Sequence, residues 1–144
     1  MADELDDLLD KYDRDSQAAQ QHTDERSQAA AEFQQSFIAW IRSTAQPTLD
    51  SFAQRLRARG HSAEVDVGTG NNPLIELELQ PKGRQFSRTA LKFRPVVAHQ
   101  TVEIQIAADG GGLGSSERLL NGLTVDYVNE LLREALRIVL ENWS

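Results

Sequence analysis

The spacing of apolar residues changes from a helical to a strand period at Gly60, and this change limits the possible folds. In the segment before it, 33–59, apolar side chains recur every three or four residues, as on one face of a helix. In the segment after it, 62–107, they alternate with polar side chains. Such alternation is typical of antiparallel sheets, because parallel sheets are covered on both faces. The order of the two patterns predicts an α+β fold.

Four alternating segments predict four strands that follow one another as an antiparallel meander. They are centred on Val65, Leu77, Phe93 and Ile104. On the polar face, the charge alternates from Glu76 to Lys92 to Glu103, and opposite charges on neighbouring strands favour this pairing by roughly a few tenths of a kcal/mol per pair. The glycine-rich segment 109–116 is expected to be a flexible loop, and 117–122 is compatible with a helical turn or a short strand.

Two helical regions flank these strands. The first, 33–59, contains Pro47, which lacks a backbone donor and is expected to kink or split the helix. Gly60 is its expected end. The second region, 124–143, has Thr124 as its expected N-cap. Its continuous apolar stripe is expected to pack across the apolar face of the sheet and consists of Val128, Leu131, Leu132, Ala135, Leu136, Val139 and Trp143.

We therefore predict a two-layer α+β domain with the element order α-β-β-β-β-α. A long, proline-interrupted N-terminal helical region precedes a four-stranded antiparallel meander, and a C-terminal helix packs on the sheet. This single domain covers 33–144, whereas residues 1–32 form an acidic, helical and partly disordered arm. A length of 144 residues is ordinary for one domain.

The arm carries the whole net charge of the chain. Residues 1–32 hold ten acidic and three basic side chains, a net charge of −7, and the remaining residues hold equal numbers of each. Alanine and glutamine favour a helix here, although the apolar pattern fades between Ser16 and Arg26, so we expect a firm helix only from about Ala29. Acidic arms usually act through partners rather than through chemistry.

A short apolar stripe lies near the beginning of the arm. Its members have helical spacing and are Leu5, Leu8, Leu9 and Tyr12. The sequence LDDLLDKY over 5–12 resembles the LD motif of paxillin-type adaptors, LDxLLxxL, with Tyr12 in place of the last leucine. The resemblance implies that the segment docks its leucines into a groove of a partner. The alternative is that the stripe packs on its own domain or on a twin chain.

The sequence contains no convincing motif for catalysis, metal binding or cofactor binding. The chain has no cysteine, which excludes disulfides, thiolate metal sites and cysteine nucleophiles. No serine lies in a G-x-S-x-G elbow, and His22, His61 and His99 lack a second ligand at metal-binding spacing. The glycines within 110–114 lack the Lys-Ser/Thr pair of a phosphate-binding loop. We expect no enzyme activity, no cofactor and no metal.

Targeting and membrane signals are also missing from the sequence. Its beginning lacks the basic and apolar regions of a secretory signal, and no apolar run approaches the roughly 20 residues of a bilayer span. The lack of cysteine suits a reducing compartment. We expect a cytoplasmic protein with no membrane partner.

A basic stretch is a candidate anion-binding site. Its members are Lys82, Arg84, Arg88, Lys92 and Arg94, with Phe86 among them. Basic side chains contact phosphates, and an aromatic ring can stack on a base. The competing interpretation is an ordinary solvated hairpin, and the acidic balance of the chain argues against nucleic acid as a partner. A further hypothesis is that the acidic arm folds back over this basic stretch.

Three functions remain open at this point. The leading hypothesis is a non-enzymatic interaction module, an adaptor or chaperone-like protein, that binds a protein partner or self-associates as a homo-oligomer such as a homodimer. It would dock through the arm and the sheet, and in size, acidity and α+β class it is similar to small acidic secretion chaperones. One alternative is a small apolar ligand in a cavity lined by Phe37, Trp40, Leu77, Phe93 and Leu136. The other is phosphate or nucleic-acid contact through the hairpin 82–94.

Overall fold

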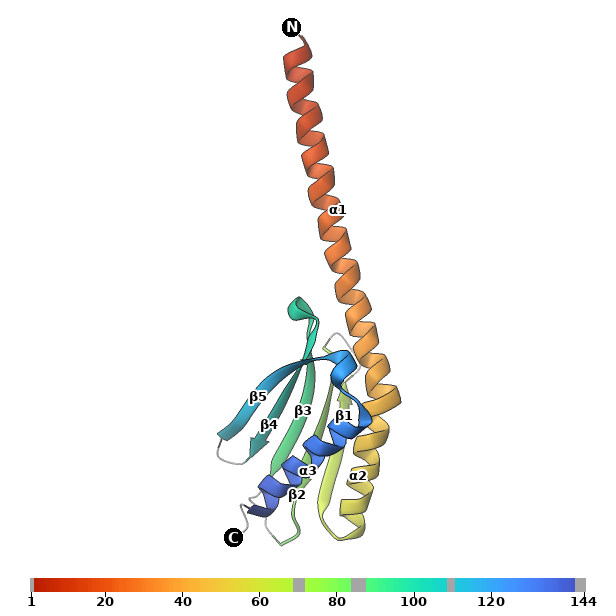
Figure 1. Ribbon diagram of the computed structural model, residues 1–144, viewed down its shortest axis with the longest axis vertical. Helices are drawn as coiled ribbons and strands as arrows, with labels where there is room; N and C mark the ends of the chain where they lie inside the picture. The colour runs from red at the N-terminus through yellow and green to blue at the C-terminus, as the bar shows by residue number, and fades with distance from the viewer. Residues whose placement is uncertain (1, 69–71, 84–87, 109–110, 142–144) are drawn as a thin grey trace.

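A computed structural model describes residues 2–68, 72–83, 88–108 and 111–141 and has the predicted α+β class. One antiparallel sheet forms the first layer, and helices on one of its faces form the second. Figure 1 shows that most of the long helix α1 projects away from these two layers.

The N-terminal helical region runs from α1 (Ala2–Trp40) through the π-helical segment η1 (Ile41–Ala45) into α2 (Gln46–Ala58). The interruption expected at Pro47 takes the form of this π-helix. Within it the turn is wider, and the N–H of Gln46 bonds the carbonyl five residues back. Pro47 itself lies in the first turn of α2, where a missing backbone donor is tolerated.

Helix α2 ends at glycine, as the sequence predicts. Gly60 has a φ of 90°, a left-handed conformation that glycine adopts without a Cβ penalty. Its N–H bonds the carbonyl of Arg57 at 2.9 Å, and the N–H of His61 bonds the carbonyl of Leu56 at 3.1 Å. The chain thereby turns directly into the first strand, which lies beside α2.

Within the described residues, the sheet has five antiparallel strands in sequential order. They are β1 (Ser62–Gly68), β2 (Leu74–Gln80), β3 (Thr89–Val96), β4 (Thr101–Ala108) and β5 (Gly111–Leu119). Two short 3-10 helices follow β3 and β5, namely η2 (Val97–His99) and η3 (Leu120–Gly122).

The fifth strand corrects the prediction of a four-stranded meander. The glycine-rich segment expected to be a loop pairs instead with β4, with Ala108 opposite Gly111 and Thr101 opposite Leu119. Its glycines give it low strand propensity and no alternating pattern, so the sequence conceals the strand. The unpaired edge of β4 has backbone donors and acceptors that need partners, and β5 satisfies them.

The C-terminal helix α3 (Val125–Glu141) packs on β3 and beside α2. It begins as predicted, because the hydroxyl of Thr124 accepts a hydrogen bond from the N–H of Tyr127 at 3.2 Å. Its buried side chains are Val128, Leu131, Leu132, Ala135 and Val139. The end of the predicted stripe, Trp143, lies outside the described residues.

The core between the sheet and the helices is centred on three aromatic rings. Phe37 and Trp40 of α1 stack with their centroids 5.6 Å apart, and Trp40 meets Phe93 of β3 edge-on at 5.3 Å. The indole Nε1 of Trp40 donates to the carbonyl of Leu123 at 2.8 Å. These contacts attach the last turns of α1 to both the sheet and the start of α3.

Candidate functional site

The leucine stripe, defined as Leu5, Leu8, Leu9 and Tyr12, lies at the free end of α1. These side chains are exposed by 62, 61, 52 and 69%, respectively, although all four are largely apolar. The acids around them are Asp6, Asp7, Asp10 and Asp13. Helix α1 also continues through 16–26, where the sequence predicts only weak helix formation. The stripe is therefore presented at the end of an unbroken helix.

The leucine stripe is far from the domain of its own chain. Every residue from 4 to 28 is exposed, and the first buried side chain after them is Phe33. Because an α-helix rises 1.5 Å per residue, Leu5 lies about 42 Å along the axis from Phe33. Figure 1 shows the N-terminus and α2 at opposite ends of the molecule. Any fold-back of the arm onto its own domain would require α1 to break.

A second exposed apolar surface, the interhelical groove, lies between α2 and α3. Two adjoining clefts of about 530 and 280 Å³ form it and share Phe52, Arg55 and Asn129 among their lining residues. The half-buried side chains of Phe52, Leu56 and Leu136 supply its apolar surface. Its rim carries three exposed arginines: Arg55, Arg59 and Arg133.

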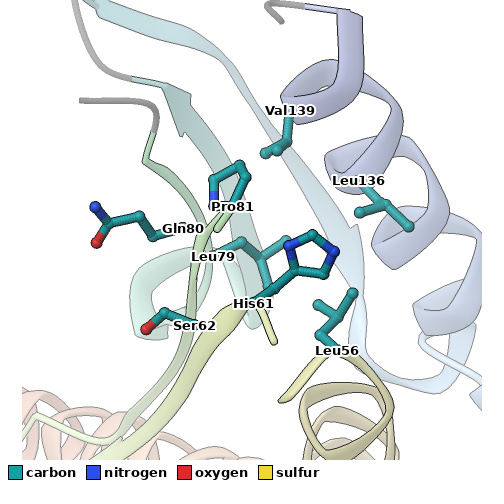
Figure 2. Close-up of a pocket in the computed structure, with 8 residues that line it drawn as sticks. All are labelled: Leu56, His61, Ser62, Leu79, Gln80, Pro81, Leu136 and Val139. Carbon is teal, nitrogen blue, oxygen red and sulfur yellow. The ribbon is translucent and has the colours of Figure 1, made fainter. Parts of the chain in front are cut away.

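A small pocket adjoins the groove around His61. Figure 2 shows the imidazole among Leu56 of α2, Leu79 of β2 and Leu136 of α3. The backbone N–H of Lys82 donates to Nδ1 of His61 at 3.1 Å, so the proton of the neutral ring lies on Nε2. The pocket has a volume of about 20 Å³, which is room for little more than one water molecule. The groove is therefore the larger binding surface here.

Two members of the predicted basic stretch lie on the outer face of the sheet beside acids. Lys92 of β3 is opposite Glu76 of β2. Arg94, also on β3, forms an ion pair with Glu103 of β4 at 2.7 Å. Opposite charges thus lie on neighbouring strands as the sequence indicates, with an ion pair for Arg94 and an acid opposite Lys92.

The other members of the basic stretch lie elsewhere. Lys82 follows β2, and its side chain runs alongside Gly60, where an added Cβ would come within 3.1 Å of Cδ. Arg88 is exposed just before β3. Arg84 and the aromatic Phe86 lie outside the described residues. Within the part of the chain that the structure describes, the basic stretch is thus divided between the hairpin end and the outer face.

Four acids crowd the outer face of β1 and β2. The register places Glu64 opposite Glu78 and Asp66 opposite Glu76. The pKa of Glu76 is raised above its usual value, chiefly by partial burial. A hydrogen bond with Glu78 and repulsion from Glu78 and Asp66 add to the rise, whereas the positive charge of Lys92 opposes it. Like charges directly opposite one another destabilise a sheet.

Four of the five residues considered for an apolar ligand are part of the core. Phe37, Trp40, Leu77 and Phe93 are buried in one continuous cluster, whereas Leu136 lines the groove. Among the residues that can be placed, no group of three or more His, Asp or Glu side chains could hold a metal ion. The helices of this same part of the chain include none with the length and apolarity to cross a bilayer.

Comparison with protein-family models, curated protein sequences and solved structures gives no significant match to this chain. The groove was missed by sequence reasoning, which assigned Leu136 to the sheet-facing stripe of α3. The one local signal for it is the spacing of Phe52, Arg55, Leu56 and Arg59, which places apolar and basic side chains together on α2.

Proposed function

We propose that this protein is a non-enzymatic, self-associating interaction module of the adaptor or chaperone-like kind, in which α1 makes the contact with a second chain. The observation that carries this proposal is the exposure of every residue from 4 to 28 in a helix that bears the leucine stripe. Isolated helices are marginal in water, because most helical stability in proteins comes from packing of an apolar face. Contact with another chain would provide that packing.

The sheet is the second docking surface of the proposed module. Strand β5 is at an edge, and its residues from Gly114 to Leu119 are all exposed. An edge strand has unpaired backbone groups that can bind a strand of a partner. The exposed side chain of Leu119 adds an apolar contact at the end of this edge.

The molar mass of the full chain in solution tests the proposal. We expect sedimentation equilibrium to give more than the 16.1 kDa of one chain, and a variant with alanine at all four stripe positions to give one chain. Because these side chains are exposed within one chain, the variant should keep the wild-type unfolding curve at a chain concentration too low for self-association. A matched control, Gln17→Ala with Gln21→Ala, changes exposed arm residues outside the stripe and should assemble normally. A single-chain mass for the wild-type protein at every concentration would refute self-association.

A further inference from the structure

We infer that the interhelical groove is the receptor for the leucine stripe of a second copy of this chain. The inference rests on the proposed self-association and specifies the contact that would produce it. The groove and the stripe are the two exposed apolar surfaces on helices described above, and neither is covered within one chain. The two surfaces have compatible lengths and opposite charges, and α1 carries the stripe far enough from its own domain to contact a second chain.

The groove is long enough to hold the leucine stripe along the axis of its helix. The residues of α2 and its C-cap that line the groove extend from Pro47 to Arg59, about 18 Å along the helix axis. The leucine stripe from Leu5 to Tyr12 covers about 10 Å. A helix therefore fits lengthwise between α2 and α3, with its leucines against the apolar surface that Phe52 helps to form, as in other complexes of an amphipathic helix in a groove.

The charges of the two surfaces are opposite. The residues that line the groove include Arg55, Arg59 and Arg133 and no acid. Within the described part of the chain none of these three arginines forms an ion pair. The stripe is flanked by aspartates, and the segment 4–15 has six acids against two bases. Opposite potentials of this kind guide association and fix its register.

The occupant must come from another chain because of the geometry of α1. The stripe lies about 42 Å from Phe33, in the direction away from α2, and the helix has no break in between. Suppose that the stripe of one copy lies antiparallel on α2 of the other, with Leu8 near Phe52. The two N-terminal helical regions then cross halfway between these positions, where Ala30 of one copy meets Ala30 of the other. Residues 29–31 are three alanines, which allow two helices to approach closely. The exchange is then reciprocal and closes as a two-fold dimer.

Mixing two complementary variants of the full chain tests this contact. The arm variant carries Leu8→Glu and Leu9→Glu, and the groove variant carries Arg55→Glu and Arg133→Glu. All four side chains are exposed within one chain, so both variants should keep the wild-type unfolding curve in urea at a chain concentration too low for self-association. We expect each variant alone to raise the dissociation constant of self-association at least about a hundredfold. An equimolar mixture should regain part of the assembly, because one of the two reciprocal contacts is then intact: the groove of the arm variant can bind the stripe of the groove variant.

A matched control changes the same charges outside the groove. Arg42→Glu with Arg137→Glu alters exposed arginines on η1 and α3 that do not line the clefts, and it should assemble as the wild type does. If the groove variant also assembles as the wild type does, the stripe binds elsewhere, for example to the stripe of a twin chain. That result overturns the inference but leaves the proposed function intact. A single-chain wild-type protein overturns both.

Engineered cysteines give a second, independent measurement. The natural chain has none, so Leu9→Cys in one preparation and Ser51→Cys in another can form a disulfide only between different chains. We expect this mixed disulfide to form on oxidation, and Gln21→Cys paired with Ser51→Cys to give much less. Equal yields from the two pairs would contradict docking of the stripe in the groove.

Discussion

The two ends of α1 have the same secondary structure and opposite surroundings. Its last turns bury Phe33, Phe37 and Trp40 in the core, whereas residues 4–28 are exposed on every side. The difference shows which part of the helix depends on tertiary packing. The embedded end is held by long-range contacts, and the projecting end is held by its own sequence and by its continuity with the embedded end.

Local interactions explain how the projecting end remains helical. Alanine and glutamine are good helix formers, and side chains four residues apart bond one another. The amide of Gln20 donates to Asp24 at 3.1 Å, and the amide of Gln28 donates to Glu32 at 3.2 Å. Each such pair contributes only about 0.2–0.5 kcal/mol. None of them involves the leucine stripe, whose four side chains are all exposed.

The largest expected change in the free energy of unfolding comes from truncating a core side chain at the embedded end of α1. Phe37→Ala removes a fully buried ring and should lower the free energy of unfolding by about 3–5 kcal/mol. Leu8→Ala at the projecting end should change it by less than about 0.5 kcal/mol. Urea denaturation followed by tryptophan fluorescence, at a chain concentration too low for self-association, measures both. Similar losses for the two variants would mean that the projecting end is packed on its own domain.

A proline in the projecting end separates helicity from domain stability. Ala19→Pro should cost the helix about 3 kcal/mol locally, because it removes a backbone donor and clashes with the preceding turn. Far-ultraviolet circular dichroism should therefore fall, while the urea midpoint of the domain, measured at a chain concentration too low for self-association, stays unchanged. Self-association should weaken as well, since the stripe loses its fixed direction. Ala19→Ser is the control, and a lowered urea midpoint for the proline variant alone would contradict the division between the two ends.

A smaller effect is expected from the hydrogen bond that attaches the embedded end to α3. Trp40→Phe leaves the carbonyl of Leu123 without its donor at 2.8 Å, which should lower the free energy of unfolding by about 1–3 kcal/mol. Tyr12→Phe removes a polar group from an exposed ring and should have no measurable effect on stability. Thermal unfolding compares the two variants, and an unaltered melting temperature for Trp40→Phe would show that the bond adds little.

Much of the fold follows from local sequence patterns. Gly60, Thr124 and the alternation in β1 to β4 specify helix ends and strands through interactions within a few residues. The exception, β5, is a strand because β4 has a free edge, and its glycines carry no pattern of their own. The helix at 16–26 similarly depends on continuity with the packed turns that follow it, which a short window of sequence does not contain.

The candidate site also has one part that local sequence predicts and another that only the folded structure shows. The leucine stripe can be found from the spacing of Leu5, Leu8, Leu9 and Tyr12, because all four lie within two turns of one helix. The groove cannot, because Phe52 and Leu136 come from helices that meet only in the folded protein. The like charges across β1 and β2 also require the register of the two strands, in which Asp66 faces Glu76.

The smallest expected change in the free energy of unfolding comes from removing one acid of the sheet, and the control removes one acid of the arm. The pKa of Glu76 is raised, chiefly by burial and by Glu78, so the folded chain binds this proton more tightly than the unfolded chain does. Its ionisation therefore lowers stability as the pH rises past the usual carboxyl pKa. Glu76→Gln should raise the free energy of unfolding by about 0.5 kcal/mol at neutral pH, and the gain should vanish in acid. Asp10→Asn, in the exposed arm, should leave stability unchanged at both pH values, and an equal gain there would mean that net charge, rather than crowding on the sheet, is the cause.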